Sequence, residues 1–189
     1  PVFVDKPLSI KLEELRYFKK YLENGLLMSC SGLRYAAELD SVRSNLSSYG
    51  QIKLIKGVVV NNWEQYGIHL LESILSTTKS RAISILPTNA NHSSYSIKLD
   101  NDAILQLDTI RDIPKTFLID IWGTKKRSSH EISDNFTAFR RTIWHFINLI
   151  ENSFISIDAN ETIELMKIII AGKIARSEKR EVLIKEIII

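Results

Sequence analysis

Four strand-like segments follow one another in the middle of the chain, and this run limits the possible folds more than any other feature. Each contains isoleucine or leucine, residues that suit strands, and the segments are residues 80–87, 93–100, 103–109 and 115–123. The turn Asp100-Asn101-Asp102 between the second and third is typical of a β-hairpin. Because strands joined by short turns pair antiparallel, the sequence predicts a largely antiparallel or mixed sheet.

Helical patterns lie on both sides of these strands. Before them, apolar residues recur at helical spacing in residues 9–24, 35–49 and 62–75. Ser9 is placed to cap the first helix, and Gly25 and Gly50 mark the ends of the first two. Strands are expected at residues 2–4, 26–30 and 51–60.

After the strands, residues 121–132 predict one more turn with strand edges, and two helices follow at 136–150 and 160–174. Residues 181–184 favour a last strand. Helices that precede and follow a block of strands are typical of an α+β domain. We therefore expect a two-layer fold, in which a mixed, largely antiparallel, open β-sheet has helices packed on one face.

The other face of that sheet also needs an explanation. The segment Thr116–Trp122 is apolar on both sides of the strand in places, which indicates that part of the second face is buried too. A second copy of the chain is the simplest cover, so we expect a homo-oligomer formed through the open sheet face.

Composition narrows the class of protein. The chain has 189 residues, of which 44% are hydrophobic and 25% charged, as in a globular protein with one good-sized domain or barely two. The net charge of +3 is small, and the basic run Lys125-Lys126-Arg127 lacks interleaved aromatic residues, so a solvated loop is favoured over a nucleic-acid contact. No apolar run reaches the roughly 18 residues of a membrane span. The single cysteine, Cys30, favours a buried thiol in a reducing cytoplasm.

Common catalytic motifs are missing from the sequence. Neither GxGxxG nor GxxxxGK[ST] occurs, so any nucleotide site would have to be completed elsewhere. The four histidines, at positions 69, 92, 130 and 145, lack the spacing of metal ligands. We therefore expect no metal site.

Two short stretches can carry chemistry. The first is Asp5-Lys6-Pro7, where a lysine follows a strand end, the position at which α/β proteins place their sites. Such a lysine can hydrogen-bond a hydroxyl or stabilise a developing alkoxide. Taken alone, a lysine beside a proline is more often an ordinary surface residue.

The second stretch is WEQYGIHLLE, residues 63–72. His69 lies in an apolar helix with Tyr66 one turn before it, and histidine is the natural proton acceptor near neutral pH. Gly67 costs about 1 kcal/mol in a helix interior, which suggests that a ligand or another backbone approaches closely there. The alternative is a hydrogen-bonded core histidine beside a glycine that serves helix packing.

Together and in this order, the two stretches resemble the glucose–fructose oxidoreductase, inositol dehydrogenase and MocA-like (Gfo/Idh/MocA) family. VFVDKPLSIKLEELRYFKKYLENG is similar to the family's Glu-Lys-Pro strand end and following helix, with Asp5 in place of glutamate. SGLRYAAEL is similar to its arginine-aromatic segment, and YGIHLLE to its histidine helix. The closing segment DANETIELMKIIIAGKIARSEKREVLI is similar to the family's last helix and strand.

The resemblance implies that this chain is the C-terminal part of such a protein. Residues 1–8 would be the exit strand and motif of an N-terminal Rossmann domain upstream of Pro1, and residues 9–189 the substrate-binding and oligomerisation domain. The fold would be that of the C-terminal domain of Gfo/Idh/MocA proteins. The cofactor would be NAD or NADP, bound mainly by the upstream domain, with Asp5, Lys6 and Pro7 at its edge.

The resemblance also assigns roles to residues. Lys6 would lie near the nicotinamide and the reacting hydroxyl, and His69 would act on the proton of that hydroxyl. Many members have an aspartate four residues before the histidine, where this chain has Gln65, although a subgroup with a Tyr-Gly-x-His pattern also lacks it. Tyr66 and Glu64 are candidate helpers in the proton relay. Arg34, Trp63 and Gln65 are candidate substrate-binding residues, together with Tyr66.

Two functions remain open from the sequence. The first is a domain of a cytoplasmic NAD(P)-dependent oxidoreductase acting on a sugar, polyol or related hydroxy compound, in which this part alone would be inactive. The second is a family member without catalysis that serves as a dimerisation or ligand-sensing module. Gln65 and Asp5, which replace the more common family residues, favour the second slightly.

Overall fold

A seven-stranded sheet forms the larger part of the molecule. The computed structural model describes residues 1–189, and its main sheet has the strand order β8-β7-β3-β6-β5-β4-β9. The strands are β3 (Ile52–Val60), β4 (Ala82–Pro87), β5 (Ser93–Leu99), β6 (Ile104–Ile110), β7 (Phe117–Gly123), β8 (Arg127–Glu131) and β9 (Val182–Leu183).

The pairing of these strands is antiparallel everywhere except between β3 and β6. The hairpin between β5 and β6 turns at residues 100–102, where Asp102 has a φ of 64°. The parallel pair brings the carboxyl ends of β3 and β6 to the same edge, at Val60 and Ile110. The predicted mixed, largely antiparallel, open sheet is therefore confirmed, including the strand edges around residues 121–132.

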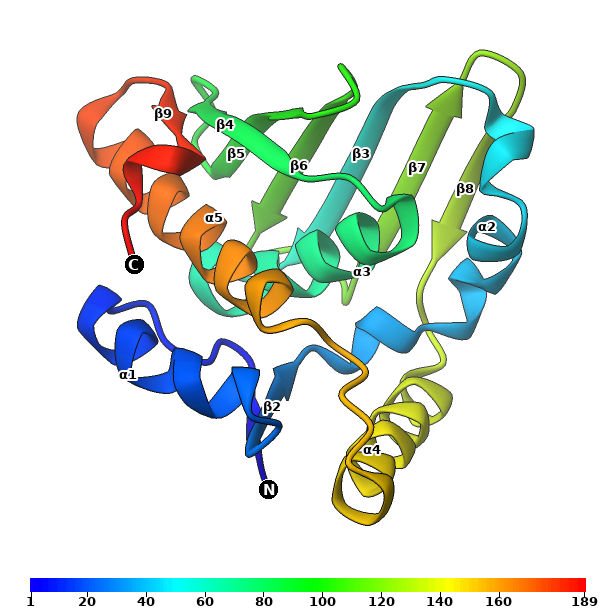
Figure 1. The fold of residues 1–189 in the computed structure, drawn as a ribbon. Coiled ribbons are helices and arrows are strands. Elements are labelled where there is room, and N and C mark those ends of the chain that lie inside the picture. Colours follow the sequence, from blue (N-terminus) through cyan, green and yellow to red (C-terminus); the bar gives the residue numbers. More distant parts are fainter.

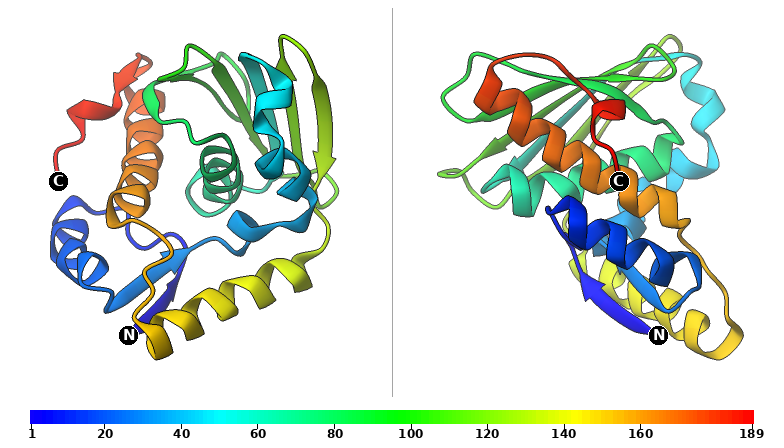
Figure 2. Two further views of the ribbon diagram at one scale, coloured as in Figure 1. Left: turned by 45° about the vertical axis from the view of Figure 1, so that its right-hand side comes forward. Right: turned by 60° about the vertical axis from the view of Figure 1, so that its left-hand side comes forward.

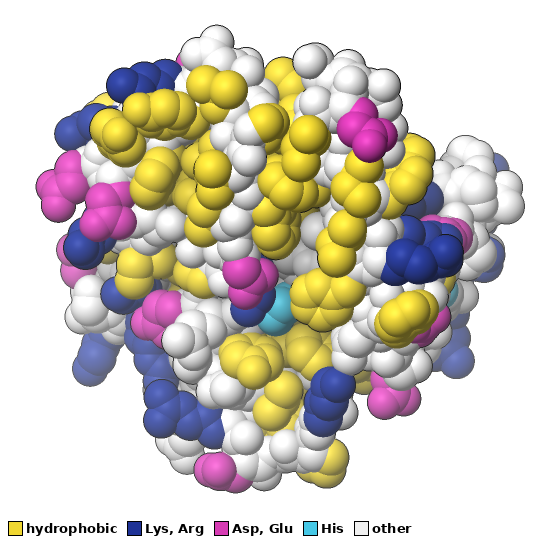
Figure 3. Space-filling view, turned by 90° about the horizontal axis from the view of Figure 1, so that it is seen from below, with side chains coloured by type: hydrophobic (Ala, Val, Ile, Leu, Met, Phe, Trp, Pro, Cys, Tyr) yellow, Lys and Arg dark blue, Asp and Glu magenta, His cyan; other side chains and the backbone are white.

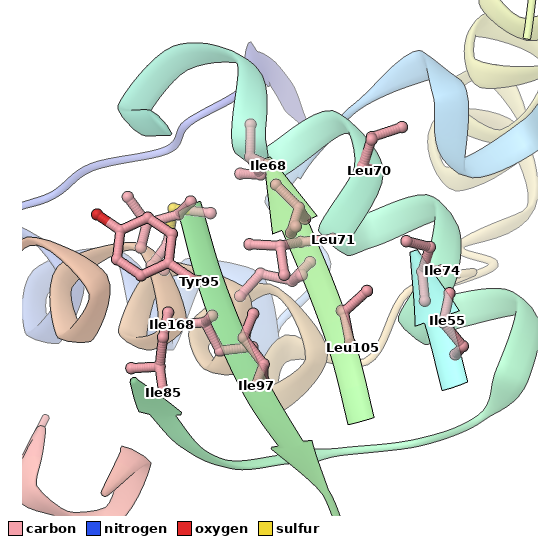
Figure 4. Close-up of a cluster of buried hydrophobic side chains, with 14 of the residues drawn as sticks. Ile55, Ile68, Leu70, Leu71, Ile74, Ile85, Tyr95, Ile97, Leu105 and Ile168 are labelled. Atoms are coloured by element: carbon pink, nitrogen blue, oxygen red, sulfur yellow. The ribbon is translucent and has the colours of Figure 1, made fainter. Parts of the chain in front are cut away.

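Helices cover one side of this sheet (Figures 1 and 2). The helices of the molecule are α1 (Leu12–Glu23), α2 (Asp40–Ser44), α3 (Ile68–Thr78), α4 (Asn135–Asn152) and α5 (Ala159–Glu178). Figure 4 shows α3 and α5 contributing apolar side chains, among them Leu71 and Ile168, to a cluster completed by Ile97 and Leu105 from the sheet. All four are at most 1% exposed, so this layer is the main core.

A second, smaller sheet lies below the first (Figure 1). Strands β1 (Val2–Asp5) and β2 (Leu27–Cys30) pair in parallel, and α1 connects them. Gly25 ends α1 with a φ of 66°, a left-handed conformation that suits glycine. The predicted strand–helix–strand order at the start of the chain is thus confirmed.

Two local predictions need correction. The continuous helix expected over residues 35–49 is instead a series of 3₁₀ turns around the short α2. Ala36 has an extended ψ of 128°, and the guanidinium of Arg43 donates hydrogen bonds to the main-chain oxygens of Arg34 and Ala36, which a helix would use. Ser9 does not cap α1, which begins at Leu12; its hydroxyl accepts the Lys11 N–H at 3.0 Å instead.

One face of α4 is apolar and uncovered. Figure 3, seen from below, shows hydrophobic side chains gathered on the side of the molecule where α4 and the small sheet lie in Figure 1. The exposed apolar residues of α4, here called the α4 stripe, are Phe136, Phe139, Ile143, Trp144, Ile147 and Ile150. Apart from the adjacent pair Ile143 and Trp144, they recur along the helix at intervals of three and four residues, and an uncovered apolar surface of this kind is typical of interaction sites.

Candidate active site around Lys6 and His69

The end of β1 meets the start of the histidine helix. Lys6 follows β1 directly, and its Nζ donates a hydrogen bond to the main-chain oxygen of Gln65 at 3.2 Å. The same Nζ lies 5.5 Å from the centre of the Tyr66 ring, within the range of a cation–π contact. Asp5 is exposed, and the peptide bond between Lys6 and Pro7 is cis. The structure thus brings the two stretches singled out in the sequence into contact.

The histidine helix begins with an irregular turn. Residues Trp63–Gly67 form a π-helical turn that runs into α3, and such turns are frequent at functional sites. Asn62 caps it, because its Oδ1 accepts the Gln65 N–H at 2.8 Å and its Nδ2 donates to Gln65 Oε1 at 3.1 Å. Gln65 is therefore tied to the cap, and its side chain makes no hydrogen bond to His69.

His69 packs against two aromatic rings, which also contact each other. Its ring centre lies 5.5 Å from that of Tyr66 and 5.7 Å from that of Phe117, in edge-to-face contacts. Its Nδ1 lies 2.7 Å from Ser31 Oγ. Burial, together with the positive charge of Lys6, lowers the pKa of His69 to about 3. His69 is therefore a neutral imidazole near pH 7.

A buried ion network holds Ser31 in place. The main-chain N–H of Ser31 donates to Glu72 Oε2 at 2.7 Å, and Glu72 Oε1 accepts from the guanidinium of Arg34 at 3.4 Å. The other terminal nitrogen of Arg34 bonds Glu161. Complete burial raises the pKa of Glu72 to about 7, against the opposing effect of Arg34. Arg34, expected as a substrate contact, is itself buried and engaged by these two carboxylates.

Trp63 is part of the core rather than the surface of the site. It is 1% exposed, and its indole N–H donates to the main-chain oxygen of Ile169 at 2.9 Å. A Cβ on Gly67 would lie 2.7 Å from the indole, which explains the glycine: the close approach comes from this ring and not from a ligand.

A polar cleft lies on the side of the same turn that faces β5, β6 and α5. It has a volume of about 800 Å³, and its lining includes Asn61, Asn62 and Glu64 together with Arg111, Lys173 and Arg176. Glu64, expected as a helper in proton transfer, lines this cleft. His92 also lines it, and the Nε2 of His92 pairs with Asp108 Oδ1 at 2.7 Å.

Three residues that complete the site were not singled out in the sequence. Ser31 and Glu72 lie 38 and 41 positions, respectively, from their hydrogen-bond partners His69 and Ser31, and Phe117 comes from β7. No local pattern links them, although Glu72 was visible as an acid in an otherwise apolar stretch of helix. The sequence signal for Ser31 was its place at the start of SGLRY, where its Oγ caps a turn by accepting the Leu33 N–H at 3.1 Å.

Other kinds of site find little support. No group of three or more histidine, cysteine or acidic side chains could hold a metal ion. Cys30 is buried, and desolvation raises the pKa of its thiol, which disfavours the reactive thiolate. None of the helices has the length and hydrophobicity needed to cross a membrane.

Solved structures with this fold include inositol dehydrogenases. Scyllo-inositol dehydrogenase from Lactobacillus casei, solved with bound NAD(H) and scyllo-inositol, matches with a TM-score of 0.82 and 14% identity over 97% of this chain and 73% of that one. Myo-inositol dehydrogenase from Corynebacterium glutamicum matches with a TM-score of 0.82 and 11% identity over 97% and 72% of the two chains. Myo-inositol 2-dehydrogenase from Lactobacillus plantarum matches with a TM-score of 0.82 and 14% identity over 96% and 73%.

These likenesses confirm the fold that the resemblance to Gfo/Idh/MocA proteins implied: the chain has an open, mixed sheet shared with inositol dehydrogenases. No protein-family model matches the sequence, and no curated protein sequence matches it significantly. At 11–14% identity the likeness is one of fold. The activity of this chain is therefore argued from its own site.

Proposed function

We propose that this chain is the substrate-binding domain of an NAD(P)-dependent oxidoreductase that acts on a sugar, polyol or related hydroxy compound. One observation carries the proposal: Lys6 and His69, far apart in sequence, both contact the ring of Tyr66, Lys6 through Nζ at 5.5 Å and His69 through its ring at 5.5 Å. An ammonium group and an imidazole that flank one surface can hold a single substrate oxygen between them. Inositol dehydrogenases of the same fold make polyols the first substrates to test.

Oxidation of a secondary alcohol removes a hydride from the carbon and a proton from the oxygen. A bound nicotinamide would accept the hydride. In the reverse reaction, the reduction of a ketone, Lys6 Nζ and His69 Nε2 would bind the carbonyl oxygen and supply the proton that it gains, and the rings of Tyr66 and Phe117 would limit the access of water to them. We propose Lys6 and His69 as catalytic residues, with Tyr66 as a substrate contact.

Residues at the end of β1 would form one edge of a cofactor site. Asp5, Lys6 and Pro7 lie at the carboxyl end of β1, a strand in a parallel pair, which is where nucleotide cofactors bind in α/β proteins. The side chain of Lys6 reaches from this end to the histidine helix. The residues present therefore fit the edge of an NAD(P) site, and we propose that an N-terminal nucleotide-binding domain supplies the rest.

The small sheet supports this division of the protein. Parallel sheets are normally covered on both faces and contain more than two strands, whereas β1 and β2 pair only with each other. The α4 stripe leaves an apolar surface on the same side of the molecule. We propose that residues 1–8 form the exit strand of the nucleotide-binding domain, that its sheet and helices pack against β1, β2 and α4, and that residues 9–189 bind substrate.

The outer face of the large sheet is the proposed oligomer contact. Leu54, Val58, Leu118 and Trp122 alternate with the buried core residues of their strands and keep part of their surface exposed. Lys56 lies over the Trp122 ring at 5.7 Å, so the face is mixed in polarity. We propose that the protein forms a homo-oligomer through this face. We also propose that it works in the reducing cytoplasm, where the free thiol of Cys30 would persist.

The test uses the longest natural protein that contains residues 1–189. NAD(P)H absorbance is followed with myo-inositol, scyllo-inositol and a panel of sugars and polyols, for the wild type and for Lys6→Ala. We expect Lys6→Ala to lower kcat/KM by about 10²-fold or more while circular dichroism stays unchanged. Lys11→Ala removes a lysine on the nearby α1 entry and serves as the matched control. Equal turnover in Lys6→Ala and Lys11→Ala would refute the catalytic role.

A second function is favoured by one observation. Gln65, in place of the aspartate common in the family, carries no charge and is bound to the Asn62 cap, so His69 has no carboxylate partner on its own helix. A family member that binds ligand and dimerises without catalysis would have such a site. Binding of NAD(P)H and of a polyol by calorimetry, without turnover of any compound in the panel, would favour this sensing module.

A further inference from the structure

The hydroxyl of Ser31 is fully enclosed and has two neighbours. Ser31 is 0% exposed. Its Oγ accepts the main-chain N–H of Leu33 at 3.1 Å and lies 2.7 Å from Nδ1 of His69. Leu33 N–H can only donate. Nδ1 is therefore the one group in hydrogen-bond contact that can receive the hydroxyl proton of Ser31.

The position of that proton decides where His69 carries its own. If Nδ1 were protonated, Ser31 Oγ would accept two N–H groups and its hydroxyl proton would be buried without an acceptor, which is costly. If Nδ1 is unprotonated, every group in this contact is satisfied. Nε2 of His69 then bears the proton. This nitrogen makes no hydrogen bond in the structure. It is not one of the buried side-chain atoms that lack a partner, so it is accessible at the surface of the site.

We propose that Ser31 holds neutral His69 in the tautomer with its proton on Nε2, so that His69 presents a hydrogen-bond donor, and not an acceptor, to the substrate oxygen. Ser31 is a positioning residue, since it acts through His69. The Glu72 carboxylate fixes Ser31 by accepting its main-chain N–H at 2.7 Å. This inference rests on the proposed function for its meaning in catalysis.

A donor at Nε2 changes the kind of substrate that the site fits. Lys6 Nζ is a donor as well, so a bound oxygen would meet two donors. A carbonyl oxygen can accept from both, and an alkoxide is stabilised by both, as in an oxyanion hole. The arrangement therefore favours a keto sugar or keto polyol as the bound compound, with its carbonyl polarised by His69 and Lys6.

The tautomer can be measured on the 189-residue chain without any substrate. Uniformly ¹⁵N-labelled protein is studied by long-range ¹H–¹⁵N correlation of the histidine rings between about pH 6 and pH 8, with His69→Gln to assign the signals of His69 among the four histidines. We expect Nε2 to give the protonated and Nδ1 the unprotonated type of ¹⁵N signal, with a roughly tenfold or larger excess of this tautomer. A protonated Nδ1 in the wild type would overturn the proposal.

Variants test whether Ser31 sets the tautomer. Ser31→Ala should mix the two ¹⁵N patterns, and Ser31→Thr, which keeps the hydroxyl, should restore the wild-type pattern. Ser73→Ala is the matched control, because Ser73 is equally buried and its hydroxyl bonds the main-chain oxygen of His69 rather than the ring. An unchanged tautomer in Ser31→Ala would refute the positioning role.

Two further arms keep the test decisive. If Ser31→Ala does not fold, Ser31→Gly, which also lacks the hydroxyl, is measured in its place, and a wild-type pattern in this variant also refutes the role. Because no turnover is involved, a negative result in the polyol assay leaves the ¹⁵N result intact. The failure of the proposed function and the failure of this inference are therefore distinguishable.

Discussion

The indole of Trp63 packs against two glycines, Gly67 and Gly172, and replacing Gly172 tests this packing most directly. A Cβ on Gly172 of α5 would lie 2.6 Å from Nε1 of Trp63 and 2.7 Å from Cε2. Such distances require a displacement. The indole cannot move freely, since its N–H bonds the main-chain oxygen of Ile169 at 2.9 Å and its ring packs on Tyr95 with 4.3 Å between ring centres.

The size of the effect follows from two opposing terms. Overpacking a well-packed core costs roughly 1–3 kcal/mol, and the pinned indole places Gly172→Ala near the upper end of that range. Alanine gains about 1 kcal/mol over glycine in a helix interior. We therefore expect a net loss of about 2 kcal/mol in the free energy of unfolding, or a fall in Tm of roughly 4–8 °C for a protein of this size.

Urea denaturation followed by circular dichroism measures this loss. Gly32→Ala is the control, because its Cβ would lie 3.4 Å from Phe139, an ordinary contact, and its backbone is not left-handed. The double variant Trp63→Leu/Gly172→Ala should lose the penalty that Gly172→Ala shows alone, since the ring that causes it is gone. A Gly172→Ala protein as stable as the wild type would refute the account of Trp63 as a pinned core residue.

Two further predictions concern stability against pH. The pKa of Glu72 is raised from 4.5 to about 7 in the folded state, so the protonated carboxyl stabilises the fold fully below pH 4.5, and this stabilisation is lost as the pH rises through 7. Between pH 5 and pH 8, the free energy of unfolding of the wild type should therefore fall by roughly 2 kcal/mol relative to that of Glu72→Gln, as measured by urea denaturation. The pKa of His69 is instead lowered from 6.5 to about 3, so stability present above pH 6.5 is lost as the pH falls toward 3. Thermal melts at pH 7 and pH 4.5 should show a smaller fall in Tm for His69→Gln than for the wild type, and equal falls would contradict the burial of a neutral imidazole.

The larger elements of this fold could be predicted from sequence because their signals are local. The strands of the main sheet follow one another with short turns, and the residues 100–102 that join β5 to β6 are turn formers. The apolar spacing of α4 and α5 spans several helical turns in each case. By contrast, residues 35–49 have apolar residues at helical spacing but do not form one helix, because the guanidinium of Arg43 competes for the carbonyls that a helix would use.

Sequence could also indicate that Lys6 and His69 belong together, but only through the resemblance to a family. The lysine and the histidine are 63 positions apart by their numbering, and their meeting at the Tyr66 ring depends on how β1 lies against the π-helical turn. Gly67 was an ambiguous signal, since a glycine in a helix admits a ligand or a neighbouring side chain equally well. The indole of Trp63, four residues earlier, decides between them.

The partner of His69 shows why the rest of the site could not be predicted. A carboxylate next to an imidazole favours the charged form and accepts the ring N–H, which leaves the other nitrogen free to take a proton. In this chain the position on the same helix that could supply such a carboxylate is Gln65, and it is bound to Asn62. The neighbour of Nδ1 is instead a neutral hydroxyl from 38 positions away, at 2.7 Å. A hydroxyl cannot stabilise an imidazolium as a carboxylate does, so nothing at Nδ1 offsets the burial and the nearby positive charge of Lys6, which lower the pKa of His69. With Gln65 bound to Asn62 and the hydroxyl of Ser31 at Nδ1, His69 has no acid beside it to support an imidazolium, and in the proposed tautomer it donates a hydrogen bond rather than accepting a proton.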